Sequence, residues 1–156
     1  MGQKKVSQAS RLRPPRVVLD TNILISAVLF SGRTSQLVKF WQEGRILVLM
    51  SPDVLKEYVK VLAYPKFKLA KQEIKSVIEQ ELLPFVEPVR VSKAIRVIAE
   101  DPSDDKFLSL ALGGKSDFII SGDKHLLGLK EFGGIKIVPA EEFLSREVKP
   151  LHIPKG

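Results

Sequence analysis

The fold is decided by one stretch near the amino terminus, Arg16-Val17-Val18-Leu19-Asp20-Thr21-Asn22-Ile23-Leu24-Ile25. Its first half is an apolar, β-branched run that is typical of a buried strand, predicted over residues 16–20. A helix is predicted to follow directly over residues 22–30, with Thr21 or Asn22 as its cap. Asp20 therefore lies at the carboxyl-terminal tip of a strand, and ligands of open α/β sheets bind at that edge.

The alternation of strand and helix continues along the chain. Further strands are predicted over residues 46–50, 117–120 and 135–138, with a weak or edge strand over 85–89 between two prolines. Helices are predicted over about residues 35–42, 52–62, 70–83, 92–99, 102–112, 124–129 and 139–144. This order favours one α/β domain with a parallel sheet and helices on both faces. The loops after Asp20, Met50 and Ile120 then emerge at one edge of the sheet.

Composition excludes several classes of protein. The chain has 156 residues, enough for one domain with a real core, and it contains no cysteine for disulfides or thiolate chemistry. A membrane-spanning helix requires an apolar run of about 18 residues, and the sequence has none. Its amino terminus lacks the apolar segment of a secretory signal, so we expect a cytoplasmic protein.

The formal net charge of +7 is concentrated at the amino terminus. Residues 1–15 are predicted to form a disordered basic arm that contains no acidic residue. Its cations Lys4, Lys5, Arg11 and Arg13 are weak candidates for RNA binding, because basic arms add affinity for phosphate regardless of sequence. A solvated tail explains the same residues equally well.

Asp20 and Glu57 are the first two candidate ligands. Asp20 has an alternative role as a helix cap, but its two neighbours already offer capping side chains. Glu57 lies at the margin of the apolar stripe of helix 52–62, where its carboxylate can point along the sheet edge toward Asp20. Its alternative is a surface ion pair with Lys56 or Lys60 of the same helix.

The segment Asp101-Pro102-Ser103-Asp104-Asp105 begins the next helix and offers three acids. Asp101 is the natural cap, with proline at the first helical position. On a helical wheel Asp104 falls near the centre of the apolar face, whereas Asp105 lies far from it. We therefore expect Asp104 to act at the site and Asp105 to face solvent or to support a ligand. The alternative for Asp104 is interaction with the helix dipole alone.

Asp123 repeats the position of Asp20 at a second strand tip, after the tight step Ser121-Gly122. Its alternative is to cap helix 124–129. Asp117 precedes the same strand, so it is expected at the opposite edge in a structural role.

Together, Asp20, Glu57, Asp104 and Asp123 predict a carboxylate cluster. Clustered carboxylates repel one another and raise one another's pKa, and divalent cations relieve that repulsion. Oxygen ligands alone favour Mg²⁺ or Mn²⁺ over zinc. Such sites typically use metal-activated water to attack a phosphodiester, with one or two ions.

Four blocks of the chain resemble the PIN-domain family. The blocks are Val18-Leu19-Asp20-Thr21-Asn22, Ser51-Pro52-Asp53-Val54-Leu55-Lys56-Glu57, Asp101-Pro102-Ser103-Asp104-Asp105-Lys106-Phe107-Leu108 with Ala111, and Asp117-Phe118-Ile119-Ile120-Ser121-Gly122-Asp123 with Lys124-His125-Leu126-Leu127. Their order and spacing are similar to the VapC-like toxins of prokaryotic toxin–antitoxin systems. The resemblance covers residues 16–144 and leaves residues 145–156 as a tail.

The resemblance implies a three-layer α/β/α sandwich, Mg²⁺ or Mn²⁺ dependence and endoribonuclease activity. It also implies a homodimer and, for toxins, a small antitoxin protein whose tail enters the acidic groove. Thr21 and Asn22 would orient Asp20, and Ser121 would help to hold the metal or Asp123. The basic arm is not part of the family pattern.

Other functions fit parts of the sequence. An RNA-processing nuclease would use the same acids, and an inert RNA-binding or partner-binding module would keep only the fold. A haloacid-dehalogenase phosphatase requires an aspartate two residues after Asp20, where this chain has Asn22. A basic patch can face RNA or an antitoxin, or can be a solvated helix face, and it comprises Lys66, Lys68, Lys71 and Lys75.

Overall fold

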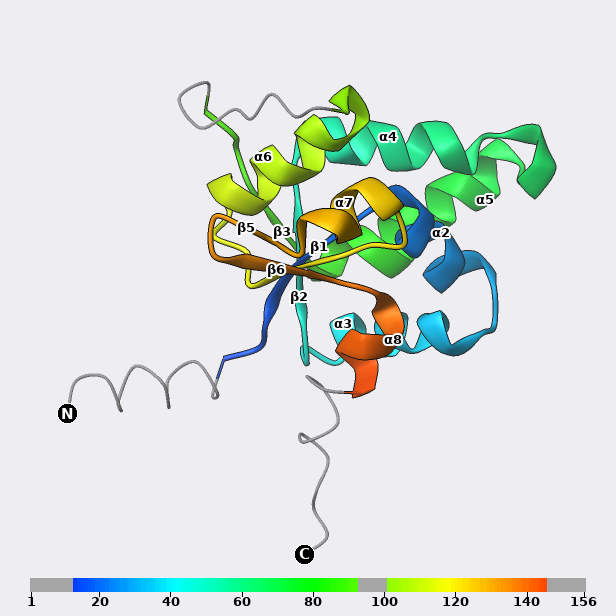
Figure 1. Ribbon diagram of the computed structural model, residues 1–156. Helices are drawn as coiled ribbons and strands as arrows, with labels where there is room; N and C mark the ends of the chain where they lie inside the picture. Colours follow the sequence, from blue (N-terminus) through cyan, green and yellow to red (C-terminus); the bar gives the residue numbers. More distant parts are fainter. Residues whose placement is uncertain (1–12, 93–100, 146–156) are drawn as a thin grey trace, which may run out of the picture.

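A computed structural model describes residues 13–92 and 101–145 of the chain. Its six strands form one sheet in the order β3-β2-β1-β4-β6-β5. Neighbouring strands are parallel except β5 and β6, which form an antiparallel pair. Helices flank this sheet (Figure 1), which confirms the predicted α/β/α sandwich with a mainly parallel sheet.

The elements follow the predicted order. The strands are β1 (Arg16–Leu19), β2 (Leu47–Met50), β3 (Val86–Pro88), β4 (Phe118–Ile120), β5 (Glu131–Phe132) and β6 (Ile135–Val138). The α-helices are α2 (Thr21–Leu29), α3 (Gln36–Gln42), α4 (Pro52–Leu62), α5 (Lys71–Ser76), α6 (Asp105–Gly113), α7 (Lys124–Leu129) and α8 (Ala140–Phe143). Shorter helical turns are η1 (Arg33–Ser35), η2 (Pro65–Phe67), η3 (Val77–Leu82), η4 (Leu83–Phe85) and η6 (Pro102–Asp104).

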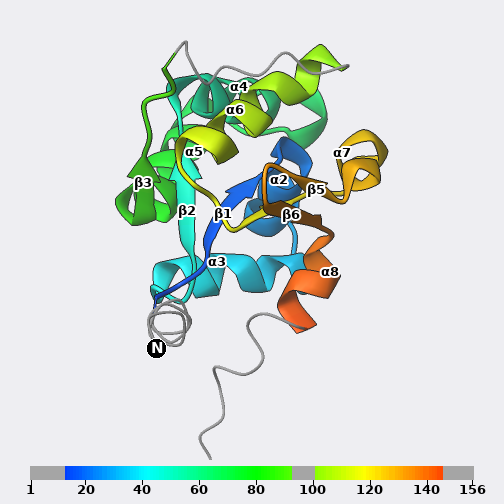
Figure 2. The ribbon, with the colours of Figure 1, turned by 60° about the vertical axis from the view of Figure 1, so that its left-hand side comes forward.

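Strand β1 lies in the middle of the sheet, between β2 and β4, and Figure 2 shows it beside β2. Leu19 pairs with Ile120 in the parallel register, so the residues that follow them, Asp20 and Ser121, are neighbours. The parallel pairing with β2 brings the end of that strand and the start of α4 to the same edge. The predicted meeting of these loops at one edge is therefore confirmed.

The core consists of strands buried on both faces and of helices packed against them. Val17, Val18 and Leu19 of β1 are fully buried, and α6 packs against β1, β2 and β4. Helix α4 begins at a cap, where the Ser51 hydroxyl accepts a hydrogen bond from the Val54 amide. The buried Tyr58 of α4 donates a hydrogen bond of 2.6 Å to the Leu19 carbonyl, which ties this helix to the end of β1.

Two regions differ from the prediction. The helix expected over residues 70–83 is divided into α5, the wider π-helical turn η3 and the 3₁₀ turn η4. Pro84 lies in the first turn of η4, where its missing amide donor is tolerated, and the helical turns continue to Phe85. The two-residue strand β5 was not predicted. It pairs with β6 through a turn in which Gly133 and Gly134 have φ of 58° and 84°, the left-handed region that such hairpins require.

Some predictions concern residues outside the described ranges. They include all but the first residue of the helix expected over 92–99, the basic arm with Lys4, Lys5 and Arg11, and most of the tail. Arg13 is described and is exposed. Among the described residues, none of the helices has the length and apolar character needed to cross a membrane.

Candidate active site

Asp20 is held at the tip of β1 by three groups. Its side chain is buried, and its Oδ1 accepts a hydrogen bond of 3.0 Å from the Ile23 amide, which caps α2. Its Oδ2 accepts one hydrogen bond from the Ser121 hydroxyl and another, of 3.3 Å, from the Gly122 amide. Asp20 thus fulfils the capping alternative and also faces the neighbouring strand tip.

The electrostatics of Asp20 reflect this burial. Removal from water raises the pKa of its carboxyl group, and the negative charge of Asp123 adds to the rise. The hydrogen bonds from Ser121, Ile23 and Gly122 act in the opposite direction. Three hydrogen-bond donors therefore stabilise the ionised form of Asp20, but no cationic side chain of the described residues contributes to its pKa.

The loop after β4 places Ser121 between the two strand-tip acids. Its hydroxyl is fully buried, donates to Asp20 and accepts a hydrogen bond of 2.9 Å from the Asp123 amide. Asp123 is half-buried and precedes α7, but its side chain makes no capping hydrogen bond. The capping alternative for Asp123 is therefore wrong, and its carboxylate belongs to the edge that it shares with Asp20.

Asp104 lies where η6 passes into α6, with only 6% of its surface exposed. The inward position predicted from the helical wheel is confirmed. Burial raises the pKa of Asp104 to about 6, and the negative charges of Asp123, Asp101 and Asp20 add to the rise. The positive charge of His125 opposes it. Asp20 and Asp123 therefore lie close enough to Asp104 for their charges to raise its pKa.

Glu57 has a different environment. Its half-buried carboxylate on α4 forms an ion pair of 3.2 Å with the ammonium group of Lys106 on α6. The predicted surface pair was with a lysine of its own helix, whereas the observed partner lies on the helix that begins beside Asp104. Lys106 was not predicted as part of the site, because no local pattern connects positions so far apart in the sequence.

The remaining predicted positions are Thr21 and Asn22, which follow Asp20 in the chain, Ser121 at the tip of β4, and Asp105, which follows Asp104. Thr21 is buried, and its Oγ1 has no hydrogen-bond partner within the described part of the chain. Asn22 is exposed on α2. The Ser121 hydroxyl, rather than either of these side chains, contacts the Asp20 carboxylate. Asp105 is half-buried beside Asp104.

This donor set fits a hard divalent cation. It offers carboxylate oxygens whose charges repel one another, and the buried hydroxyl of Thr21, the residue after Asp20, has no hydrogen-bond partner among residues 13–92 and 101–145. Mg²⁺ and Mn²⁺ prefer oxygen ligands of this kind. Within residues 13–92 and 101–145, however, no three acidic or histidine side chains already stand close enough together to hold an ion.

Comparisons with known proteins agree with this geometry. Residues 16–125, which include all four candidate acids, match the family model described as PIN domain. No curated protein matches the chain.

Proposed function

This chain belongs to the PIN-domain family, whose members are generally nucleases, and from that premise we propose that it is a metal-dependent endoribonuclease hydrolysing RNA phosphodiester bonds. One observation supports the proposal above the others. Asp20 and Asp104 are buried carboxylates with raised pKa values at a single sheet edge, and the negative charge of Asp123 contributes to the rise in both. Buried carboxylates with a purely structural role are usually paired with cationic side chains. The carboxylates of a phosphoryl-transfer site instead repel one another until a metal ion binds.

Asp20, Asp104 and Asp123 would hold Mg²⁺ or Mn²⁺, with Glu57 as a fourth ligand once it leaves Lys106. The bound ion would neutralise charge on the phosphate and make water a better nucleophile. The protein fixes the site through Ser121 and the Ile23 amide, which orient the two oxygens of Asp20. Tyr58 holds the preceding carbonyl of β1 and so positions the strand end from which Asp20 projects.

For the biological role, we propose a cytoplasmic toxin of a toxin–antitoxin pair, acting as a homodimer and inhibited by a small antitoxin protein. The four sequence blocks and their spacing support this role. An RNA-processing nuclease is the alternative that uses the same chemistry, and an inert RNA-binding or partner-binding module is the alternative without it. A small gene adjacent to that of this chain would favour the toxin.

The activity is tested by cleavage of single-stranded RNA with Mg²⁺ or Mn²⁺. We expect Asp20→Asn and Asp104→Asn each to reduce the cleavage rate by about 100-fold or more, because each removes charge that binds the ion. Asp53→Asn is the matched control, since Asp53 is an exposed acid in the first turn of α4. Equal cleavage by wild type and Asp20→Asn would refute the proposal.

A further inference from the structure

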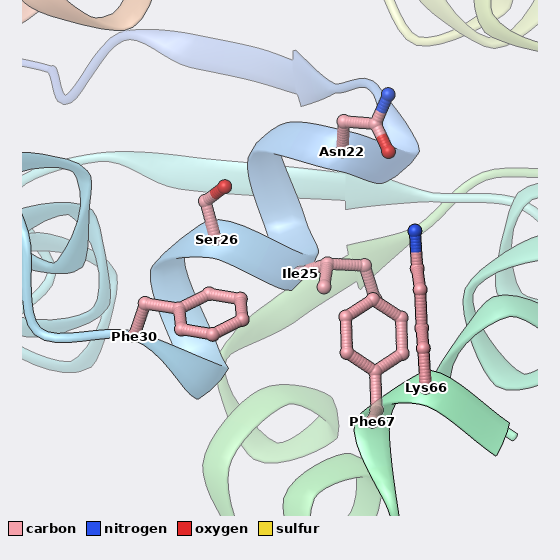
Figure 3. Close-up of a pocket in the computed structure, with 6 residues that line it drawn as sticks. All are labelled: Asn22, Ile25, Ser26, Phe30, Lys66 and Phe67. Atoms are coloured by element: carbon pink, nitrogen blue, oxygen red, sulfur yellow. The ribbon is translucent and has the colours of Figure 1, made fainter. Parts of the chain in front are cut away.

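A groove of about 440 Å³ runs beside α2 (Figure 3). One wall is a single face of that helix, with Asn22, Ile25 and Ser26 at helical spacing and Phe30 at the helix end. Eight residue steps at 1.5 Å each make this wall about 12 Å long. The groove therefore begins two residues after Asp20. It leads away from the acidic edge, the sheet edge that carries Asp20, Asp104 and Asp123.

The other wall is the turn η2, which contributes Phe67 and Lys66. The ring centroids of Phe30 and Phe67 lie 6.4 Å apart and the ring planes are tilted by 59°, so an aromatic pair joins the two walls of the groove. The Lys66 ammonium lies 5.2 Å from the Phe67 ring centroid and points toward the Asn22 end of the groove (Figure 3). In the described part of the chain, the ammonium of Lys66 is paired with no carboxylate.

Several features make this surface available to a ligand. Phe30 is 56% exposed although it is a large apolar side chain at the end of a buried helix. Tyr64, which precedes η2 in the chain and is not one of the lining residues, is also 41% exposed. Lys68 closes the turn in a left-handed conformation, with φ of 53°, and is exposed like Lys66. Aromatic rings interleaved with lysines are the composition that proteins use for single-stranded nucleic acid.

We propose that this groove binds single-stranded RNA next to the bond that is cut, with a base stacked on the exposed face of Phe30 and a phosphate at Lys66; this assignment rests on the proposed nuclease function. A stacked nucleotide occupies about 3.4 Å, so a wall of about 12 Å accommodates roughly three nucleotides. The amide of Asn22 offers both a donor and an acceptor between this groove and the acidic edge. Charge favours RNA over an apolar peptide, because a peptide gains little from Lys66.

The test is the affinity of the full chain for a fluorescein-labelled single-stranded RNA of about 12 nucleotides, measured by fluorescence anisotropy in EDTA, where cleavage does not occur. We expect Phe30→Ala to weaken binding by about 5- to 150-fold, the range for loss of one stacked base. Phe30→Leu should weaken it similarly, whereas Phe30→Tyr should preserve it. An apolar peptide site would tolerate leucine, so the leucine variant separates stacking from general hydrophobicity.

Lys66→Ala supplies a second, electrostatic readout. We expect the slope of log affinity against log salt to decrease by about 0.7, the value for one phosphate contact on a single strand. Lys39→Ala is the control, because Lys39 is an exposed lysine of α3 that does not line the groove. Thermal melting of each variant verifies folding, and the exposure of Phe30 makes its replacement tolerable.

The outcomes separate this inference from the nuclease proposal. If wild type cleaves RNA but the Phe30 and Lys66 variants bind it unchanged, the groove assignment is overturned and the groove is left to a protein partner. If wild type neither cleaves nor binds RNA, both proposals are overturned. Reduced affinity of Phe30→Leu, with Phe30→Tyr and Lys39→Ala unchanged, supports the groove.

Discussion

At the scale of the residue, Asp104 is the most informative side chain of the acidic edge. An acid with a native pKa of about 6 and an ordinary pKa of 3.8 binds its proton more tightly in the folded state than in the unfolded state. The contribution of Asp104 to the free energy of unfolding is therefore fully present below pH about 4, and it is lost as the pH rises through about 6. The folded protein without metal should thus lose stability across this window.

We predict that Asp104→Asn removes this loss. In EDTA at pH 7.5, the variant should unfold with a free energy about 1–3 kcal/mol higher than that of wild type, because asparagine carries no charge to bury. At pH 4 the two proteins should be nearly equal, since Asp104 is then protonated. Urea denaturation at both pH values measures the difference. The same difference at both pH values would mean that altered packing, and not ionisation, is responsible.

The site could be predicted from sequence only where local rules apply. The helical wheel placed Asp104 inward and Asp105 away from the core because the 3.6-residue period is local information. The partners of Glu57 and Asp20 depend on contacts across the fold: Lys106 is 49 residues from Glu57, and Ser121 is 101 residues from Asp20. No periodicity encodes such separations in the sequence, so the alternative ion pair of Glu57 was predicted with a lysine of its own helix instead of Lys106.

At the scale of the element, Arg16 joins three parts of the fold from the start of β1. Its guanidinium group makes two hydrogen bonds, of 2.9 and 3.0 Å, to the Glu87 carboxylate of β3, and it donates to the Gly114 carbonyl after α6. Its backbone amide donates to Asp117, which confirms the structural role expected for that acid. A strand, an edge strand and a helix end are thus fixed by one side chain.

We predict unequal costs for breaking this junction. Arg16→Met should lower the free energy of unfolding by about 1–3 kcal/mol, because the Gly114 carbonyl and Glu87 both lose their donor. Glu87→Gln should cost less than about 1 kcal/mol, since the pair is partly exposed and one hydrogen bond remains. Glu43→Gln, which affects only the local pair with Arg45, is the control and should be near neutral. A larger loss in the free energy of unfolding for Glu87→Gln than for Arg16→Met, measured by chemical denaturation, would contradict this view of the junction.

Most elements were predictable, and the exceptions have a common cause. Strands β1, β2 and β4 are apolar runs buried on both faces, so composition alone identifies them. Strand β5 has only two residues, too few for any period, and exists because Gly133 and Gly134 turn the chain back onto β6. The π-helical turn η3 departs from the 3.6-residue period on which the expected helix over 70–83 was based.

At the scale of the whole molecule, the acidic edge and the rest of the fold are linked through metal binding. The carboxylates that weaken the metal-free protein at neutral pH are the groups proposed to bind Mg²⁺ or Mn²⁺. Any ligand that binds only the folded state stabilises it, by about 2.7 kcal/mol at a concentration of 100 times its Kd. The protein is therefore expected to be least stable when it is both metal-free and at neutral pH.

We predict that Mn²⁺ raises the melting temperature of wild type by about 5–10 °C at such a concentration, since each kcal/mol shifts a chain of this size by about 2–4 °C. Asp104→Asn should begin from a higher melting temperature in EDTA and gain much less from Mn²⁺, and Asp20→Asn should also gain little. Asp53→Asn should behave as wild type. This crossed pattern distinguishes a site from nonspecific ion effects, which would shift all four proteins alike. A full Mn²⁺ shift in Asp20→Asn would remove Asp20 from the site, and with it the reason for placing catalysis at the end of β1.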